Sequence, residues 1–141
     1  MLELSTISPQ SSREPHRIGA KSGIEVLDVA ISGSTPAAGQ GILTLLAGGN
    51  QDLFLAAEPI FQAIARQHFL LGGPGSGTAM KLVVKVRQRI KALTTAGKTM
   101  DEAVATAPTK NFDAKYGSGY LTPDVFTKLV FSSLTKSSAS Q

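Results

Sequence analysis

The segment with the clearest structural signal reads Gly73-Pro74-Gly75-Ser76-Gly77-Thr78-Ala79-Met80-Lys81. Glycine tolerates backbone conformations that other residues avoid, so this composition predicts a tight turn that opens into a helix. The preceding run 68–71 predicts a short strand, and the apolar spacing of 76–96 predicts the longest helix of the chain, ended by Gly97. Lys81 then lies early in that helix, either as an acid/base group or as a solvated lysine on its polar face.

Upstream of the glycine turn, the pattern predicts an α/β layer. Runs 24–31 and 42–47 are rich in apolar and β-branched residues and predict buried strands, while 50–66 predicts a helix kinked at Pro59. A strand, a crossover helix and a second strand at this spacing favour parallel pairing. We expect a partial Rossmann-like parallel sheet of about three strands, with a helix that begins near Glu14 before the first strand.

The remainder predicts two or three helices. Thr99 and Glu102 form a capping-box pattern, 110–119 predicts a polar loop, and a last helix should run from the Thr122-Pro123-Asp124 segment to Leu134. Charge also divides the chain, because residues 1–80 carry four basic and six acidic side chains and 81–141 carry ten basic and four acidic ones. We therefore expect a partial dinucleotide-binding fragment at 1–81 and a helical segment at 82–141.

Composition excludes several kinds of site. The chain has no cysteine and only two histidines, His16 and His68, which excludes a disulfide scaffold and a thiolate zinc site and leaves no expected metal. No long apolar run predicts a membrane span or a signal peptide, and we expect a cytoplasmic protein. The basic residues are spread out and few aromatic residues lie among them, which argues against nucleic-acid binding.

Residues 4–81 resemble the second half of the cofactor domain of the β-hydroxyacid dehydrogenases, the group of 3-hydroxyisobutyrate dehydrogenase and 6-phosphogluconate dehydrogenase. Three motifs occur in the family's order: Ser5–Pro9 with Ser12-Arg13, Asp28–Ser34 and Gly72–Lys81. Each motif alone is weak, whereas three in register over nearly eighty residues are specific.

The resemblance implies an oxidoreductase that uses NAD or NADP and acts on a small hydroxy acid. Lys81 would be the catalytic residue, moving a proton to or from the substrate hydroxyl. Ser32, Gly33 and Ser34 would bind the substrate carboxylate, and Thr6 would lie near the nicotinamide end of the cofactor.

Two departures from the family pattern leave the activity open. No Gly-x-Gly-x-x-Gly turn precedes Ser5, and Lys85 stands where the family places an asparagine. We therefore interpret the chain as a truncated or composite relative with lost or impaired activity, which would need homo-oligomerisation or a partner chain to supply the missing half. The alternatives are a non-enzymatic scaffold module and an anion-binding module that uses Ser32-Gly33 and the helix start at Gly75.

A second resemblance concerns residues 87–135, which are similar to the C-terminal tail of some metallo-β-lactamase-fold hydrolases. Its segments are 96–104, 108–117 and 119–123. The zinc-binding His-x-His-x-Asp-His motif of that fold is missing, so this tail would bring no catalytic residue.

Overall fold

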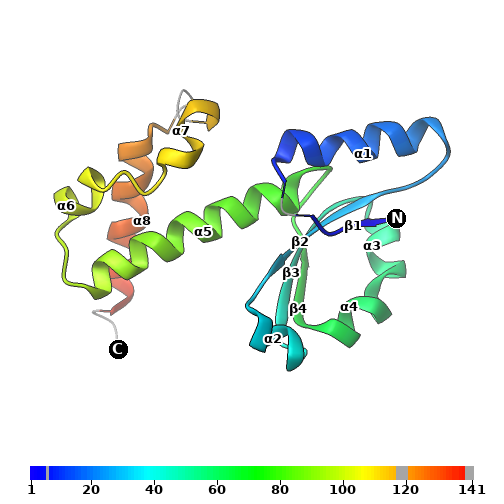
Figure 1. Cartoon of the computed structure of the whole chain (residues 1–141), viewed down its shortest axis with the longest axis horizontal. Coiled ribbons are helices and arrows are strands. Elements are labelled where there is room, and N and C mark those ends of the chain that lie inside the picture. Colours follow the sequence, from blue (N-terminus) through cyan, green and yellow to red (C-terminus); the bar gives the residue numbers. More distant parts are fainter. Residues whose placement is uncertain (6, 117–120, 139–141) are drawn as a thin grey trace. The chain divides into compact units, whose positions relative to one another are not determined.

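The computed structural model describes residues 1–5, 7–116 and 121–138 and divides the chain into two compact units, Met1–Leu82 and Val83–Gln141 (Figure 1). Helix α5, Ser76–Thr95, begins in the first unit and continues into the second. The other elements of the first unit are β1 (Leu2–Glu3), α1 (Pro9–Lys21), β2 (Leu27–Ser32), α2 (Thr35–Gly39), β3 (Leu43–Gly49), α3 (Gln51–Ala56), α4 (Glu58–Ile64) and β4 (Ala65–Leu70). This order confirms the predicted Rossmann-like α/β class.

The sheet has four strands in the order β1-β2-β3-β4 and is mixed. The pairs β1/β2 and β3/β4 are parallel, as expected, but β2 and β3 are antiparallel, with Asp28 opposite Gly48 and Ser32 opposite Thr44. The expectation of an entirely parallel sheet is therefore wrong. Only residues 33–42 join β2 to β3, whereas a parallel crossover needs roughly a dozen or more residues.

Helix α1 begins at Pro9, earlier than the predicted start near Glu14. The Ser8 side chain accepts a hydrogen bond from the Ser11 amide as N-cap, and Pro9 takes the first position, where its missing N–H costs nothing. Pro15 lies inside the helix rather than in its first turn. Helix α1 packs against the sheet, and Ser12 is completely buried there.

The predicted helix 50–66 is divided into α3 and α4 at Ala57, two residues before Pro59. Asn50 is the N-cap of α3 and accepts hydrogen bonds from the amides of Asp52 and Leu53, as its position predicts. Strand β4 starts at Ala65, three residues before the predicted strand. Pro59 therefore lies in the first turn of α4, where a proline is tolerated.

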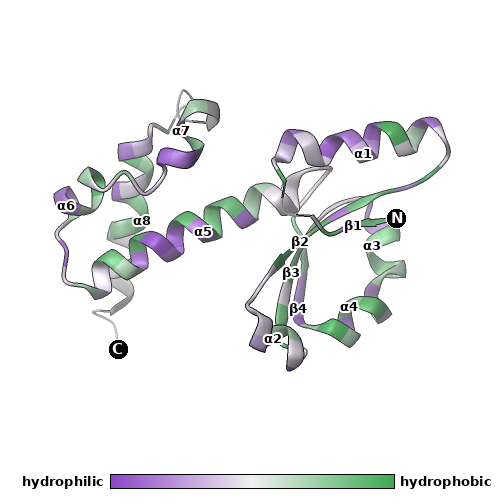
Figure 2. Ribbon diagram, in the orientation of Figure 1, coloured by the Kyte–Doolittle hydropathy of each residue, from purple (hydrophilic) through white to green (hydrophobic). Residues whose placement is uncertain are grey.

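The two faces of the sheet bury different partners. One face presents Leu27, Val29 and Leu45, all with no solvent exposure, to Ala57 and Phe61 of the crossover helices. Figure 1 shows α3 and α4 beside this part of the sheet, and Figure 2 shows that they are largely hydrophobic while α1 is more polar. The opposite face carries Asp28, and α1 and the glycine turn lie against it.

The second unit is helical and comprises the later turns of α5 with α6 (Met100–Ala105), α7 (Lys110–Tyr116) and α8 (Pro123–Ser138). Its core is formed by Val86, Ile90, Ala103 and Phe131. The expectation of two or three helices after α5 is confirmed, and so is the capping box between Thr99 and Glu102.

The prediction of a polar loop at 110–119 is wrong for residues 110–116, which form α7. Residues 117–120 lie outside the described part of the chain. Arg89 explains part of the difference, because it donates a 2.8 Å hydrogen bond to the Pro108 carbonyl and lies 5.7 Å from the centre of the Phe112 ring. These contacts hold a polar segment that has little local signal of its own. No helix among the described residues is long and apolar enough to cross a membrane.

Candidate functional site

A fully buried carboxylate joins the glycine turn to strand β2. Oδ1 of Asp28 accepts a 2.7 Å hydrogen bond from the Gly75 amide, and Oδ2 accepts a 3.2 Å bond from the Thr78 amide. The Thr78 hydroxyl lies 3.5 Å from the same Oδ2. Asp28 has no solvent exposure, so these donors replace the water that its carboxylate gives up on folding.

The glycines of the turn are required by close backbone approach. Gly75 has φ +86°, and a Cβ at Gly77 would overlap the Leu46 carbonyl oxygen. A Cβ at Gly48, opposite Asp28 in the sheet, would lie 2.6 Å from the Gly73 carbonyl oxygen and 2.7 Å from Asp28 Oδ1. Glycine at these positions lets α5 start directly on the sheet, within reach of the carboxylate.

Helix α1 closes the other side of the cluster. Nε2 of His16 lies 3.3 Å from Asp28 Oδ1, the Ser12 Oγ lies 3.4 Å from the Thr78 hydroxyl, and Nε of Arg13 donates a 3.2 Å bond to the Pro74 carbonyl. All three side chains come from one helix. The structure thus joins parts of all three sequence motifs in one contact network, which we call the Asp28 cluster. It consists of Ser12, Arg13, His16, Asp28, Gly75 and Thr78.

The predicted substrate residues lie at the far end of β2 from Asp28. Ser32 is half-buried and Ser34 is exposed, while Gly33 adopts φ +150°. Because strand side chains alternate, Ser32 faces the same side of the sheet as Asp28, about 13 Å away at roughly 3.3 Å per residue. Ser32 therefore shares its face with the glycine turn.

Lys81 is half-buried in the second turn of α5. It follows Gly77 by four residues, about 6 Å along the helix at roughly 1.5 Å per residue. The start of α5 contacts the sheet face that carries Asp28 and Ser32. Thr6, the predicted cofactor contact, lies outside the described residues.

The start of α5, which the anion-binding alternative would use, is already occupied by the Asp28 side chain. A glycine turn at a helix N-terminus is favourable for anions because its amides are unpaired and the helix dipole is positive there. In this chain the amides of Gly75 and Thr78 already donate to Asp28. The carboxylate of Asp28 thus occupies the position that an external phosphate would need.

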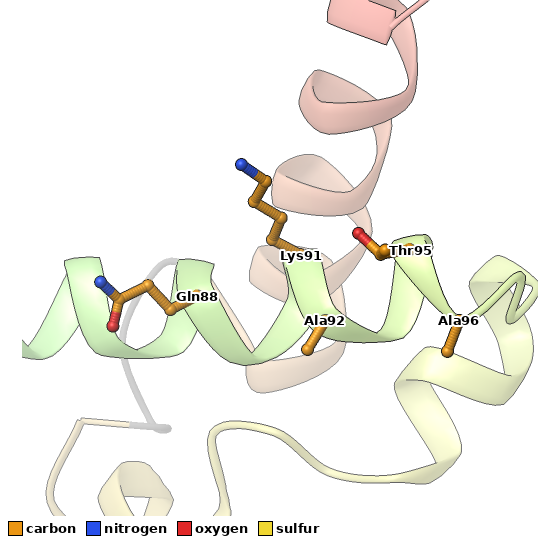
Figure 3. A pocket seen from close by; sticks show the side chains of 5 residues that line it. All are labelled: Gln88, Lys91, Ala92, Thr95 and Ala96. Atoms are coloured by element: carbon orange, nitrogen blue, oxygen red, sulfur yellow. The ribbon is translucent and has the colours of Figure 1, made fainter.

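The other surface features have no combination of side chains suited to acid/base catalysis or metal binding among the described residues. An open hollow in the second unit is lined by Gln88, Lys91, Ala92, Thr95 and Ala96 along the exposed side of α5 (Figure 3). Its residues include no acid/base pair. Within residues 1–5, 7–116 and 121–138, no three His, Asp or Glu side chains gather where they could hold a metal ion.

Comparison with protein families matches residues 1–73, just over half of the chain, to the NAD-binding domain of 6-phosphogluconate dehydrogenase. The chain belongs to this family. The resemblance of residues 4–81 to β-hydroxyacid dehydrogenases is thereby confirmed, and the expected cofactor class agrees with the family's NAD-binding domain.

Individual members of the family support the same assignment. The chain is 33% identical over 115 residues to NAD-dependent L-serine dehydrogenase of Pseudomonas aeruginosa, covering 82% of this chain and 37% of the relative. It is 30% identical over 83 residues to 2-(hydroxymethyl)glutarate dehydrogenase of Eubacterium barkeri, covering 59% and 28%. The solved structure of Mycobacterium tuberculosis 3-hydroxyisobutyrate dehydrogenase with L-serine shares the fold at a TM-score of 0.62 and 23% identity, covering 86% of this chain and 38% of that one.

The chain spans about a third of the length of these curated relatives. The similarity to the serine dehydrogenase covers more residues than the first unit contains, so it continues into the helical second unit. The hydrolase-like tail at 87–135 stays a prediction.

Sequence reasoning named Asp28 and Ser12 as motif residues but gave neither a role, and it assigned His16 to no site. His16 is mostly buried, with 12% side-chain exposure, and it faces Asp28. The i, i+4 spacing of Ser12 and His16 could have revealed their common face. It did not, because the predicted helix began after Ser12.

Proposed function

We propose that this chain forms the second half of a nicotinamide-dependent β-hydroxyacid dehydrogenase cofactor domain, with Lys81 as acid/base. The observation that carries the proposal is the Asp28 cluster. It joins the three family motifs in space, and Asp28 and Ser32 lie on one face of the sheet.

The proposed reaction is the oxidation of a small hydroxy acid to a carbonyl compound. The hydroxyl loses its proton and the carbon that bears it loses a hydride; NAD or NADP supplies the hydride acceptor when it is bound. Lys81 takes the proton on Nζ, and Ser32, Gly33 and Ser34 hold the substrate carboxylate through hydroxyl and backbone N–H donors. Thr6 is proposed to contact the nicotinamide end of the cofactor.

Pyrophosphate binding must come from residues other than the glycine turn before α5. The amides of Gly75 and Thr78 at that turn already donate to Asp28. We propose that a homo-oligomer or a partner chain completes the site. Strand β1 supports this proposal, because among the described strands it pairs only with β2 and leaves its outer edge open for another strand.

We further propose that catalysis is impaired, because Lys85 stands where the family has an asparagine. A lysine ammonium donates hydrogen bonds but accepts none, so it cannot replace an asparagine amide that does both. If orientation of the substrate fails for this reason, the surviving function is a non-enzymatic scaffold module, located in the cytoplasm.

The first test is a titration of the purified chain with NADH and NADPH, followed by nicotinamide fluorescence, with the mass in solution measured on the same sample. Saturable binding by a defined oligomer supports the proposal. Turnover of small hydroxy acids that disappears in Lys81→Met, while cofactor binding persists, assigns the role of the lysine. A folded chain that binds neither cofactor in any assembly state contradicts the dehydrogenase function and favours the scaffold.

A further inference from the structure

The Asp28 carboxylate spans the junction between the glycine turn and helix α5. One oxygen accepts from Gly75 in the turn, and the other accepts from Thr78 in the first helical turn. No water competes for these bonds, because both Asp28 and Thr78 are buried. The carboxylate also lies at the positive end of the helix dipole, which strengthens its hold.

This contact determines how α5 is rotated about its axis. Successive helical residues point about 100° apart, so the direction of the Lys81 side chain depends on that rotation. Gly77 sets how closely α5 approaches β3, but it has no side chain that could resist rotation. Thr78 does resist it, through its amide and hydroxyl toward Asp28, and it precedes Lys81 by three residues on neighbouring parts of the helix surface.

His16 and Gly48 border the carboxylate on its other side. His16 lies 3.3 Å from Oδ1, and the Cβ-free backbone of Gly48 gives Asp28 the space it occupies. Arg13 fixes the outer end of the turn through the Pro74 carbonyl. Strand β2, helix α1 and helix α5 are thus tied to one another through one group.

We propose that Asp28 is a positioning residue for Lys81: acting through the glycine turn, its carboxylate fixes the direction in which the lysine side chain leaves α5. The inference rests on the proposed function for what Lys81 does. The positioning itself is a property of the unliganded chain and can be measured without cofactor or turnover.

The test uses the whole chain with its lysines dimethylated by 13C-formaldehyde and borane and observed by 1H–13C NMR. The Lys81 signal is identified by its absence in Lys81→Arg. In Asp28→Asn, one amide oxygen remains to serve two N–H donors, so hydrogen exchange at Gly75 and Thr78 should quicken by about tenfold or more. The Lys81 methyl signal should move in the same variant, whereas the exposed Lys85 on the same helix should keep its signal.

Faster exchange at Gly75 and Thr78 with an unmoved Lys81 signal overturns the proposal and leaves Asp28 a purely structural residue. If Asp28→Asn does not fold, Arg13→Gln serves as the second variant, because Arg13 is exposed and donates to the Pro74 carbonyl in the turn. We expect a smaller shift of the Lys81 signal in Arg13→Gln. An unmoved signal there, with faster exchange at Gly75, also overturns the proposal.

These outcomes are separate from those of the proposed function. Lack of NADH binding contradicts the dehydrogenase but leaves the NMR result standing, while NADH binding with an unmoved Lys81 signal contradicts only the positioning role. Where turnover is measurable, Asp28→Asn should lower kcat by roughly 10- to 100-fold with the KM for cofactor unchanged, as expected for a misdirected acid/base group.

Discussion

The Gly75 amide donates a 2.7 Å hydrogen bond to Oδ1 of Asp28, 47 residues earlier in the chain. The bond links the turn before α5 to the beginning of β2, and it is shielded from solvent. It explains why a glycine turn that looks suited to an external anion holds an internal one instead.

Glycine at position 77 should be essential for stability. In Gly77→Ala the new Cβ meets the Leu46 carbonyl oxygen, so α5 must move away from β3; overpacking of this kind costs about 1–3 kcal/mol. The matched control is Gly39→Ala, where a Cβ meets nothing within 4 Å. Urea unfolding should show a clear loss for the first variant and little change for the control; equal stabilities would contradict the close packing.

Lys85→Asn should raise turnover if the chain has any dehydrogenase activity. The substitution restores the amide that the family resemblance implies, four residues after Lys81, where it can both donate to and accept from the substrate. We expect a higher kcat with hydroxy-acid substrates, measured as NADH formation. Lys85→Gln, a longer amide, is the control, and a gain as large as that of the asparagine variant would argue for mere loss of charge.

Pyrophosphate should leave the glycine turn undisturbed. Because Asp28 occupies the Gly75 and Thr78 amides, an added anion would have to displace a buried carboxylate. An NMR titration of the unaltered chain with inorganic pyrophosphate should therefore show no saturable shift of these two amide signals. A saturable shift would revive the anion-binding module.

The capping box of α6 should stabilise the second unit only above acidic pH. The Thr99 amide, with further help from Lys98 and the Thr99 hydroxyl, holds the pKa of Glu102 below its ordinary value near 4.5. A carboxylate whose pKa is lowered on folding contributes stability that is present above the unfolded pKa and is lost as the pH falls through the folded pKa.

Glu102→Gln should therefore lower the Tm at pH 7, and the difference from the unaltered chain should shrink as the pH falls below 4.5 and through the lowered pKa of Glu102. Asp101→Asn removes the same charge from the same helical turn without breaking the capping box, and it serves as control. A Tm difference for Glu102→Gln that persists unchanged at acidic pH would rule out the ionised capping box as its source.

Short-range signals in the sequence predict some of these elements and miss others. The Asn50 cap, the break near Pro59 and the capping box at Thr99 were all predicted, because each is encoded by a few neighbouring residues. Helix α7 was not predicted, since contacts of Arg89 with Pro108 and Phe112 support it from outside the segment. The early start of α1 was missed because the helix is capped by Ser8 and contains Pro15 in its interior rather than in its first turn.

The sequence by itself determined the α/β order, the family and the motifs that carry Lys81 and Ser32–Ser34, because hydrophobic period, glycine placement and caps are local properties. Only the tertiary structure decided that β2 and β3 are antiparallel and that Gly75 and Thr78 donate to Asp28, with Ser12 and His16 beside them. The physical reason is that a buried carboxylate must find its donors wherever the fold brings them. In this chain they come from segments up to 50 residues away.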